Sequence, residues 1–594
     1  MDASSSPDRS QVFAWKDFLS QHGHLLLKAL VIVVAGTTVL YPTLHGWWFG
    51  DDDLYLTNPI LSEPDRLWKA WFHPGSFIEY YPIMQTVEWL QWKLWGLKSA
   101  FGYHLTNLVL HLTSALLLWR LFSKLGLKLA WLGGLIFAIH PMMIETVATA
   151  CELKNTLSLP PFLLAMGFYL DFENDRKPRD YALALLLFLV AMLCKITMFF
   201  FPFVILLYAW WKQGRITWFD VKASLPFFAI SLILAIITFR AGVVFAESIQ
   251  YQSPGPIHLG GVFNRIALAG LTLAFYFGHA FLPLHPLPSY PLWKLEPVSL
   301  WLFTPWLGIA LVLICCWKKR HSWGRPVLFA LGFFVLGLAP FLGFEETSYM
   351  CLTWVTDHFA YIPLIGLIGL VVAGLEHLGH KLPRKFLPAG TAVAIAALGL
   401  LGLQTYSYAK LFEDQEKLWT YSLRYNPNLW FIHYQLGHAF ARKKEFEKAI
   451  EEFKESVRLN PDFSNAQLYL GMYLCSAGRI SEGANAFAEA VRVSPNELGG
   501  HLYLAHARLQ TGRISEAIDQ FNAVLRLQPD SIDARYSLSY ALEQEGRIPE
   551  AIAQIKAALD LQPRDPELLA RRIDLENAQR QQAKPPARAP APPK

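Results

Sequence analysis

Long apolar runs follow one another through the first two thirds of the chain and limit what it can fold into. A helix crosses a bilayer with about 20 apolar residues, and eleven runs approach or reach that length. The runs are 25–45, 103–123, 129–149, 156–171, 181–194, 197–211, 224–239, 299–317, 326–343, 359–377 and 388–407. Only 17% of the 594 residues are charged, whereas soluble domains carry about 25%. The sequence therefore predicts an all-α chain with a polytopic membrane domain over 25–408, and it argues against a soluble enzyme.

Lys and Arg are concentrated in alternate short loops, which predicts how the spans are oriented. These basic loops are 120–128, 176–179, 212–222, 318–320 and 381–385. In contrast, residues 241–263 and 344–357 contain neither Lys nor Arg. Because cytoplasmic loops are enriched in both residues, we expect the basic loops and the N-terminal segment 1–24 to be cytoplasmic. The first run lacks a following small-residue cleavage site, so we expect it to remain as an anchor.

The segment 266–283 is less apolar than the eleven runs. Whether it crosses the membrane decides on which side every later loop lies. If it crossed the membrane completely, the basic loop 318–320 would lie outside. We therefore expect it to be re-entrant or incompletely spanning, which is tolerated where backbone lines a protein cavity. Eleven full crossings then place every residue after 408 on the extracytoplasmic face.

A 34-residue period governs the C-terminal part of the chain. The recurring residues are Pro427, Pro461, Pro495, Pro529 and Pro563, with Leu436, Leu470, Leu504 and Leu538 at the same spacing. Such a period, with small and aromatic residues at fixed positions, resembles the tetratricopeptide repeat, a helix–turn–helix unit that stacks into an α-solenoid. We predict this solenoid over 415–580 and a disordered, proline-rich tail over 581–594.

The concave surface of a repeat solenoid commonly holds an extended peptide, so we expect these repeats to bind a peptide or a partner protein. The alternatives are packing against the membrane domain and oligomerisation. The repeat histidines His433, His501 and His506 are expected to be helix-face residues and not metal ligands.

Cysteine usage and net charge exclude three other classes. The six cysteines have no C-x-x-C spacing, which excludes a disulfide scaffold and a zinc finger. The net charge of +5 is small and dispersed, so the sequence does not indicate a nucleic-acid partner.

Three consecutive carboxylates, Asp51, Asp52 and Asp53, stand at the outer end of the first predicted span. Desolvation raises the pKa of a carboxyl group and mutual repulsion keeps one proton labile, so such a group can deprotonate a hydroxyl. The alternative is a solvated charge run that caps a short helix. The aromatic segments 68–74 and 80–97 that follow suit a helix lying in the membrane interface.

Further ionisable residues lie near the outer ends of the predicted spans. They are His140, Glu145, Glu152, Lys154, Lys195, Arg240 and Arg265. Each is costly to bury in a bilayer, which makes it a functional candidate. Together the cations could hold a lipid-linked phosphate, whereas each one alone could be a snorkelling or structurally paired side chain. For Glu145 the sequence supports a hydrogen bond between packed helices as well as it supports a catalytic role.

The order of several motifs is more specific than any one of them. In chain order they are WWFGDDDLYLTNP, YYP (80–82), GYHLTNLVLHL (102–112), IHPMMIETVATACELKNTLS (139–158), LCKIT (193–197), NRIALAG with FYFG (264–278), YPLW (290–293) and TDHFAYIP (356–363). In this arrangement the chain resembles a bacterial C-type glycosyltransferase of the multispan kind that carries tetratricopeptide repeats. That family is similar to eukaryotic transmembrane O-mannosyltransferases with tetratricopeptide repeats. The resemblance implies a sugar donor on a polyprenyl phosphate, used on the outer face of the membrane.

The resemblance also implies roles for individual residues. The catalytic aspartate pair is matched by Asp51 and Asp52, with Asp53 as an acidic neighbour, and which of the three is the base stays open. The positions matched to binding of the donor phosphate or sugar are Lys154, Lys195, Arg265 and His358, and the supporting positions are His140, Glu145, Asp357 and Tyr290. No set of metal ligands is implied, and whether a divalent cation joins the aspartates stays open.

We therefore expect an inverting transfer of a sugar from polyprenyl phosphate to an acceptor hydroxyl, which would be a protein Ser or Thr presented by the repeats. Two other classes remain, a lipid-linked sugar transporter and a membrane-anchored repeat scaffold. A transporter would place charges near the bilayer midplane, whereas these gather at span ends, and a scaffold would need one span only. The bacterial form of the motifs favours a bacterial inner membrane with the repeats in the periplasm.

Overall fold

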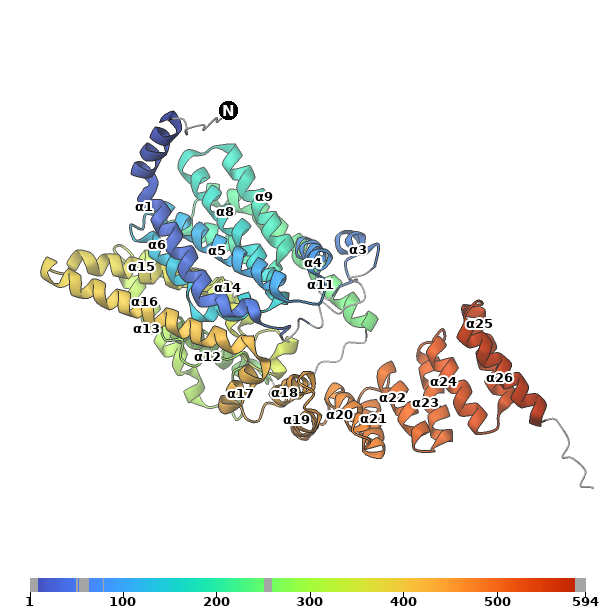
Figure 1. Cartoon of the computed structure of the whole chain (residues 1–594). Coiled ribbons are helices and arrows are strands. Elements are labelled where there is room, and N and C mark those ends of the chain that lie inside the picture. Colours follow the sequence, from blue (N-terminus) through green and yellow to red (C-terminus); the bar gives the residue numbers. More distant parts are fainter. Residues whose placement is uncertain (1–8, 50–51, 53–62, 78, 250–258, 583–594) are drawn as a thin grey trace, which may run out of the picture. The chain divides into compact units, whose positions relative to one another are not determined.

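The computed structural model describes residues 9–49, 52, 63–77, 79–249 and 259–582, and these residues form helices and no strand. They fall into two compact units, Met1–Asn426 and Pro427–Lys594 (Figure 1). Each unit buries its own set of apolar side chains, so helix packing alone builds both interiors.

The first unit is a bundle of long helices. In chain order its α-helices are α1 (Arg9–Leu40), α3 (Arg66–Phe72), α4 (Pro82–Trp95), α5 (Phe101–Lys124), α6 (Ala130–Ala138), α7 (Ile144–Ala148), α8 (Leu153–Asp175), α9 (Pro178–Cys194), α10 (Phe201–Gln213), α11 (Trp218–Ile249), α12 (Val262–Phe281), α13 (Thr304–Lys318), α14 (Gly324–Leu338), α15 (Leu364–Lys381), α16 (Leu387–Ala409) and α17 (Gln415–Tyr425). Short 3₁₀ turns near the polar residues are η1 (Tyr41–His45), η3 (Pro141–Met143), η4 (Ala150–Glu152), η5 (Ile196–Phe200), η9 (Asp357–Ala360) and η11 (Lys410–Glu413). Helices α5, α6, α8 and α9 pack most extensively on one another.

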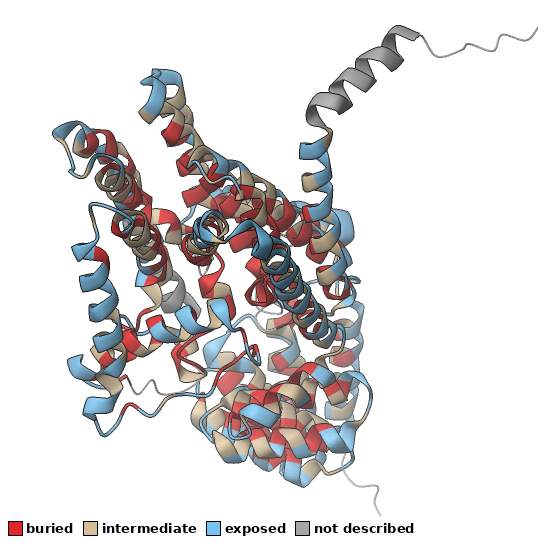
Figure 2. Cartoon of the chain, turned by 90° about the vertical axis from the view of Figure 1, so that its left-hand side faces the viewer, coloured by how far each residue is buried: buried red, intermediate tan, exposed pale blue. Residues whose placement is uncertain are grey.

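Eight helices of the described chain are long and apolar enough to cross a membrane. They are Gly23–His45, Phe101–Lys124, Ile196–Gln213, Trp218–Val244, Leu300–Lys318, Gly324–Phe341, Leu364–Lys381 and Arg384–Glu413. A ninth candidate is the pair Ala130–Ala138 and Pro141–Ala148, which is bent by 59°. Figure 2 marks the buried and the exposed residues along the helices. The exposed residues include many large apolar ones, such as Leu232, Leu307 and Leu400, as expected of helices that face lipid.

Fewer helices meet this test than the eleven crossings that the sequence predicts, and the difference has local causes. The runs 156–171 and 181–194 do form helices, α8 and α9. Lys154, Asn155 and two prolines lower the hydropathy of α8, and α9 has only 17 residues. The predicted re-entrant segment forms α12, an unbroken helix of 20 residues that is not among the eight candidates.

The bend between α6 and α7 follows from the sequence His140–Pro141. Pro141 begins η3 and has no backbone N–H, and His140 Nδ1 accepts a hydrogen bond from the Met142 backbone N–H at 3.3 Å. Before the bend α6 lies close to α5, since a Cβ at Gly134 would be 2.6 Å from the carbonyl oxygen of Ala115. The bend redirects the chain into α7, η4 and the start of α8, which carry polar residues of the site.

The second unit is a stack of helix pairs. Its helices are α18 (Trp430–Arg442), α19 (Phe446–Leu459), α20 (Ser464–Ser476), α21 (Ile480–Val493), α22 (Leu498–Gln510), α23 (Ile514–Leu527), α24 (Ile532–Gln544), α25 (Ile548–Leu561) and α26 (Pro566–Gln582). This arrangement confirms the predicted repeats. Small residues let the paired helices approach, because a Cβ at Gly437 would lie 2.8 Å from the ring of Phe453. The turns inside the pairs require a positive φ, which is +77° at Gly478 and +63° at Lys444, the same position one repeat earlier.

A polar clamp recurs in three of the repeats. One side chain on the first helix of a pair bonds to a side chain 19 residues later and to a proline carbonyl 6 residues earlier. The clamps are His433 with Glu452 and Pro427 (2.8 and 3.2 Å), His501 with Gln520 and Pro495 (2.7 and 2.8 Å), and Arg535 with Gln554 and Pro529 (2.9 and 2.7 Å). His433 and His501 therefore join each helix pair to the turn before it.

Helix α17 belongs to the membrane unit, although the predicted repeat domain begins at residue 415. The units divide between Asn426 and Pro427. The buried side chains of α17, Leu418, Trp419 and Ser422, pack within the first unit.

Candidate functional site

Asp52 is completely buried, whereas Asp51 and Asp53 lie outside the described residues. Its Oδ2 accepts a hydrogen bond from the backbone N–H of Phe49 at 2.8 Å, and its Oδ1 accepts one from the backbone N–H of Cys151 at 2.7 Å. For Asp52 the alternative of a solvated charge run is therefore wrong. Burial raises the pKa of Asp52 to about 7, although both backbone donors oppose the rise. A carboxyl group with a pKa near neutrality can take up a proton during a reaction.

A buried ion pair joins α3 to α4. Arg66 Nη2 donates to Glu88 Oε2 at 2.6 Å, and the two side chains are 2% and 6% exposed. Burial raises the pKa of Glu88 to about 7 against the lowering effect of Arg66, and the charge of Asp52 adds to the rise. Glu88 therefore senses the charge on Asp52.

Sequence reasoning missed this pair because the aromatic content of 80–97 indicated an interfacial helix. The available signal was the i, i+3 spacing of Gln85, Glu88 and Gln91, which places three polar side chains on one face of α4. That polar face is the buried one, and apolar residues such as Leu90 are exposed.

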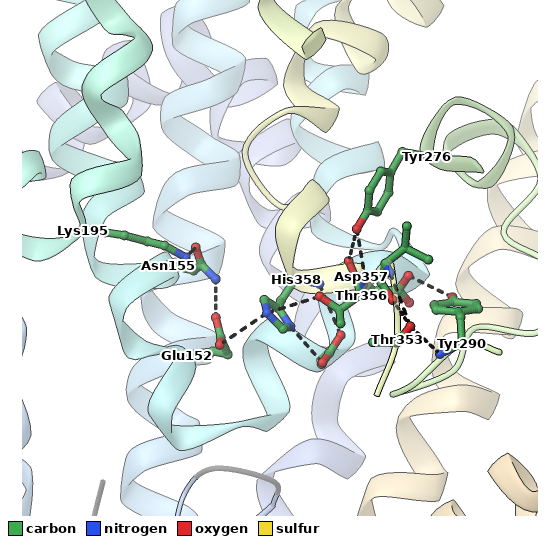
Figure 3. A network of polar contacts seen from close by, with 11 residues as sticks. Glu152, Asn155, Lys195, Tyr276, Tyr290, Thr353, Thr356, Asp357 and His358 are labelled. Atoms are coloured by element: carbon green, nitrogen blue, oxygen red, sulfur yellow. Dashed lines mark hydrogen bonds and ion pairs between the residues drawn. The ribbon is translucent and has the colours of Figure 1, made fainter. Parts of the chain in front are cut away.

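A second polar cluster joins segments that are far apart in the sequence (Figure 3). His358 of η9 lies at its centre, since its Nδ1 contacts Glu145 Oε1 at 2.9 Å and its Nε2 lies 3.9 Å from Glu152 Oε1. Asn155 links Glu152 to Lys195, because its Nδ2 donates to Glu152 and its Oδ1 accepts from Lys195 Nζ at 2.6 Å. Four of the candidate residues, Glu145, Glu152, Lys195 and His358, thus meet in one network.

Opposite charges set the ionisation of this network. Burial alone would lower the pKa of His358, but the carboxylates of Glu152 and Glu145 raise it above its usual value. Burial would raise the pKa of Glu152, whereas the positive charges of His358, Lys154 and Lys195 lower it to about 2. Burial lowers the pKa of Lys195 to about 8, although Glu152 opposes this shift. The ionised carboxylate of Glu152 therefore interacts with three basic side chains, those of His358, Lys154 and Lys195.

The predicted supporting residues Asp357 and Tyr290 contact one another beside His358. Tyr290 OH donates to Asp357 Oδ1 at 2.9 Å (Figure 3). Burial raises the pKa of Asp357 well above its usual value, and the charge of Glu145 adds to this effect. Both effects favour the protonated form of Asp357.

Tyr276 and Thr356 complete the cluster and were not predicted. Tyr276 OH donates to the carbonyl oxygen of Thr356 at 2.8 Å and accepts from its backbone N–H at 3.0 Å. Thr356 Oγ1 lies 3.3 Å from His358 Nε2. Tyr276 lies in the FYFG motif and Thr356 in the TDHFAYIP motif, and these motifs were the available signal in the sequence. Neither side chain carries a charge, so a search for ionisable residues does not select them.

Two predicted residues have partners outside this cluster. His140 Nε2 donates to the carbonyl oxygen of Ala280 at 3.1 Å, so His140 fixes the bend after α6 to the end of α12. Arg265 pairs with Glu346 at 2.7 Å and donates to the carbonyl oxygen of Phe344 at 2.7 Å. These contacts give both side chains structural roles in this conformation.

Lys154 belongs to the electrostatic site through its neighbours. Its Nζ pairs with Glu79 at 3.1 Å, and its charge lowers the pKa of Glu152 and of Lys195. The basic side chains in and beside the cluster are thus Lys154, Lys195 and His358, and side chains of this kind commonly bind anions. Within the described residues, no three His, Cys, Asp or Glu side chains are arranged to hold a metal ion.

Part of this site lies in a region that matches a known family. Residues 82–239 match the family described as dolichyl-phosphate-mannose-protein mannosyltransferase, and residues 430–463 and 502–566 match tetratricopeptide repeats. Protein O-mannosyl-transferase Tmtc3 of Drosophila melanogaster is 23% identical over 439 residues, which cover 60% of this chain and 46% of the relative. The chain carries a glycosyltransferase-family domain and is homologous to these transferases.

Two human proteins are similar to a larger share of this chain. Protein O-mannosyl-transferases TMTC3 and TMTC4 are each 23% identical to it, over 72% and 68% of this chain and 51% and 62% of the relatives. The chain spans about half the length of the curated relatives it matches. Among solved structures, MamA is 22% identical and covers 25% of this chain and 86% of its own, with a TM-score of 0.24. YrrB is 19% identical and covers 28% and 81%, with a TM-score of 0.25.

The glycosyltransferase homologue therefore combines two chemical capacities in one unit. Asp52 is a buried carboxyl group that can exchange a proton near pH 7. Lys195 and His358 lie in one network with the carboxylates of Glu145 and Glu152, and basic groups of this kind bind phosphates in proteins. Adjacent residues connect the two: the backbone N–H of Cys151 donates to Asp52, and the carboxylate of the next residue, Glu152, lies in the network of His358.

Proposed function

We propose that this chain transfers a sugar from a polyprenyl-phosphate donor to an acceptor hydroxyl on the extracytoplasmic face of a membrane. One observation carries the proposal: the backbone of Cys151 holds Asp52 beside Glu152, whose carboxylate lies in the network of His358 and Lys195. A proton acceptor and an anion-binding group are therefore held by neighbouring residues of one turn. Group transfer from a phosphate requires both.

In the proposed step the acceptor oxygen attacks the anomeric carbon of the donor sugar. A bond forms from that oxygen to the anomeric carbon while the bond from the carbon to the phosphate oxygen breaks, which inverts the configuration. Asp52 takes the hydroxyl proton through a lone pair that its backbone donors leave available. The departing polyprenyl phosphate keeps the electron pair, and its negative charge is stabilised by Lys154, Lys195 and His358. Because phosphate is a good leaving group, the step needs no general acid.

We further propose that the acceptor is a protein Ser or Thr and that the repeats bind the acceptor or a partner protein. The support is the combination of a glycosyltransferase-family domain with repeats of a kind that commonly binds peptides. The curated relatives are named as protein O-mannosyl-transferases, so mannose is the first donor sugar to test. In a bacterial host, the inner membrane with periplasmic repeats is the arrangement that the basic loops favour.

Two measurements test the proposal. Purified protein is incubated with polyprenyl-phosphate mannose and a Ser/Thr peptide, and mannosyl peptide and released polyprenyl phosphate should appear in equal amounts. A periplasmic reporter fused after Lys594 should be active, and one fused at Arg176 should be silent. Donor that is moved across vesicles without loss of its sugar would support the transporter class instead. An unchanged donor together with partner binding by the repeats would support the scaffold class.

A further inference from the structure

Helix α17 lies directly against the loop that carries Asp52. Trp419 of α17 is 1% exposed and stacks on Phe49, with ring centroids 5.3 Å apart and ring planes inclined by 13°. Gln415 at the start of α17 donates from Nε2 to the carbonyl oxygen of Trp48. The segment that leads from the last span to the repeats is therefore packed on residues 48 and 49.

Phe49 connects this packing to the carboxylate of Asp52. The backbone N–H of Phe49 donates to Asp52 Oδ2 at 2.8 Å and is one of the backbone donors that orient that carboxylate. A second ring, Phe412 of η11, lies 5.4 Å from the ring of Phe49. The approach is close, since a Cβ at Gly46 would lie 2.9 Å from the carbonyl oxygen of Phe412. A shift of Trp419 would therefore move Phe49 and, with it, a hydrogen bond to Asp52.

The other end of α17 contacts a second loop near the site. Tyr425 OH hydrogen-bonds to His285 Nδ1 at 2.8 Å, and their rings lie 4.8 Å apart. His285 has a positive φ of +50° and lies five residues before Tyr290, which bonds to Asp357. One helix thus touches both the Asp52 loop and the loop that leads to Tyr290.

We infer that α17 is a positioning element of the transfer reaction and that Trp419 acts through Phe49 to hold Asp52 in place. This inference rests on the proposed role of Asp52. Trp419 touches neither donor nor acceptor in this scheme, so it is a positioning residue. Small displacements of a reacting group, about 1 Å, can lower a rate about 10²-fold, and a rigid stacked ring resists such displacement better than an aliphatic chain.

The test compares Trp419→Leu with the conservative variant Trp419→Phe in the full-length protein. We expect Trp419→Leu to lower kcat about 10²-fold with an unchanged KM for the donor. Trp419→Phe, which keeps a ring against Phe49, should recover most of kcat. Amide hydrogen exchange at Phe49 should be faster in the Leu variant than in the Phe variant, which is a readout independent of turnover.

Trp211→Leu is the matched control, since Trp211 also stacks on a phenylalanine, Phe329, with ring centroids 4.6 Å apart, but lies beside the predicted cytoplasmic loop 212–222. It should lower Tm and leave kcat unchanged. If Trp419→Leu does not fold, Gln415→Met removes the bond to Trp48 with little change of volume and should lower kcat with the donor KM unchanged. The inference is overturned if kcat of the folded variants stays at the wild-type value, or if only the donor KM changes.

The same assay separates this inference from the proposed function. Loss of transfer in Asp52→Asn with normal kcat in Trp419→Leu would remove the positioning role alone. Full transfer in Asp52→Asn would remove the proposed base and, with it, the reaction that α17 is inferred to assist.

Discussion

The repeat unit and the membrane unit hold their polar side chains in different ways. In the repeats the clamp partners lie 6 and 19 residues apart, and the pattern returns at His433, His501 and Arg535. In the membrane unit the site contacts join residues 99 apart between Asp52 and Cys151, and 213 apart between Glu145 and His358. A change in one clamp should therefore stay within its helix pair, whereas a change in the site should affect several segments and transfer itself.

The change Asp52→Asn should have the largest effect. It keeps the size of the side chain but removes the proton acceptor, so transfer per folded molecule should fall roughly 10²–10⁴-fold. Both oxygens of Asp52 accept backbone hydrogen bonds, and an amide accepts through only one end. The free energy of unfolding should therefore also fall, by about 1–3 kcal/mol. Initial rates and Tm, measured on the same preparation, separate the two effects.

The same substitution at Asp51 and at Asp53 decides which of the three carboxylates is the base. The assignment to Asp52 predicts the greatest loss of transfer at that position. A greater loss at Asp51 or Asp53 would move the base to that residue, and full transfer in all three variants would end the catalytic interpretation of this loop.

Removal of the lysine charge in the network should have the next largest effect. Lys195→Met keeps most of the side-chain length but removes the donor to Asn155 and the charge next to Glu152. If Lys195 stabilises the departing phosphate, kcat/KM for the donor should fall roughly 10–100-fold, as expected for the loss of a hydrogen bond to a charged group. Steady-state rates at several donor concentrations measure this change.

Lys212→Met provides the comparison for Lys195→Met. Lys212 lies in a predicted cytoplasmic loop, and its Nζ is 4.4 Å from the ring centroid of Trp211. Its removal should leave kcat/KM unchanged. Equal losses in both variants would show that net charge, and not the network around Asn155, controls binding of the donor.

The pH dependence of transfer should report Asp52 and His358 together. Transfer requires the ionised form of Asp52, and burial raises its pKa to about 7, so the rate should rise as the pH increases through this value. Protonated His358 is needed to hold phosphate, and Glu152 and Glu145 raise its pKa above the usual value. The rate should therefore fall again at a higher pH, when His358 loses its proton and Lys195, whose pKa burial lowers to about 8, also begins to lose its proton.

A plot of kcat/KM against pH checks this prediction. Glu88 also has a pKa raised to about 7 and senses the charge of Asp52. The rise of kcat/KM on the acid side therefore reports the ionisation of these two carboxyl groups together. An acid limb close to pH 4 would show that Asp52 ionises like an exposed carboxyl group, which would contradict its burial in the active protein.

The two units also differ in how far their sequences predict them. The period of 34 residues predicts the repeat fold because each repeat contacts its neighbours, so local spacing contains the necessary information. In the membrane unit, apolar runs predict where helices form, and charge predicts that Lys195 and Glu145 are candidates, whereas His358 becomes a candidate only through the resemblance to a known family. These side chains come into contact because of the bend at His140 and the packing of the helices, and neither can be predicted from a local sequence pattern.

Two kinds of residue in the membrane unit could not be found in this way. Tyr276 and Thr356 are neutral, so although both lie in quoted motifs, their contacts in the network are given by the fold. Arg265 looks like an anion-binding residue from its charge alone, yet the fold gives it Glu346 as a partner. Long-range pairing therefore decides which polar residues form the site.

The smallest expected effect concerns the repeat clamp, where substitution between repeats should be tolerated. His501 and Arg535 occupy the same repeat position and make the same pair of contacts. His501→Arg should therefore keep the free energy of unfolding within about 0.5 kcal/mol. His501→Ala loses both hydrogen bonds and should lower it by about 1–2 kcal/mol. Urea unfolding of residues 427–582 measures both values, because a stack of repeats that contact only their neighbours should fold alone. An Arg variant as unstable as the Ala variant would show that each clamp depends on its own partners, and the contrast between local repeats and a long-range site would lose its support.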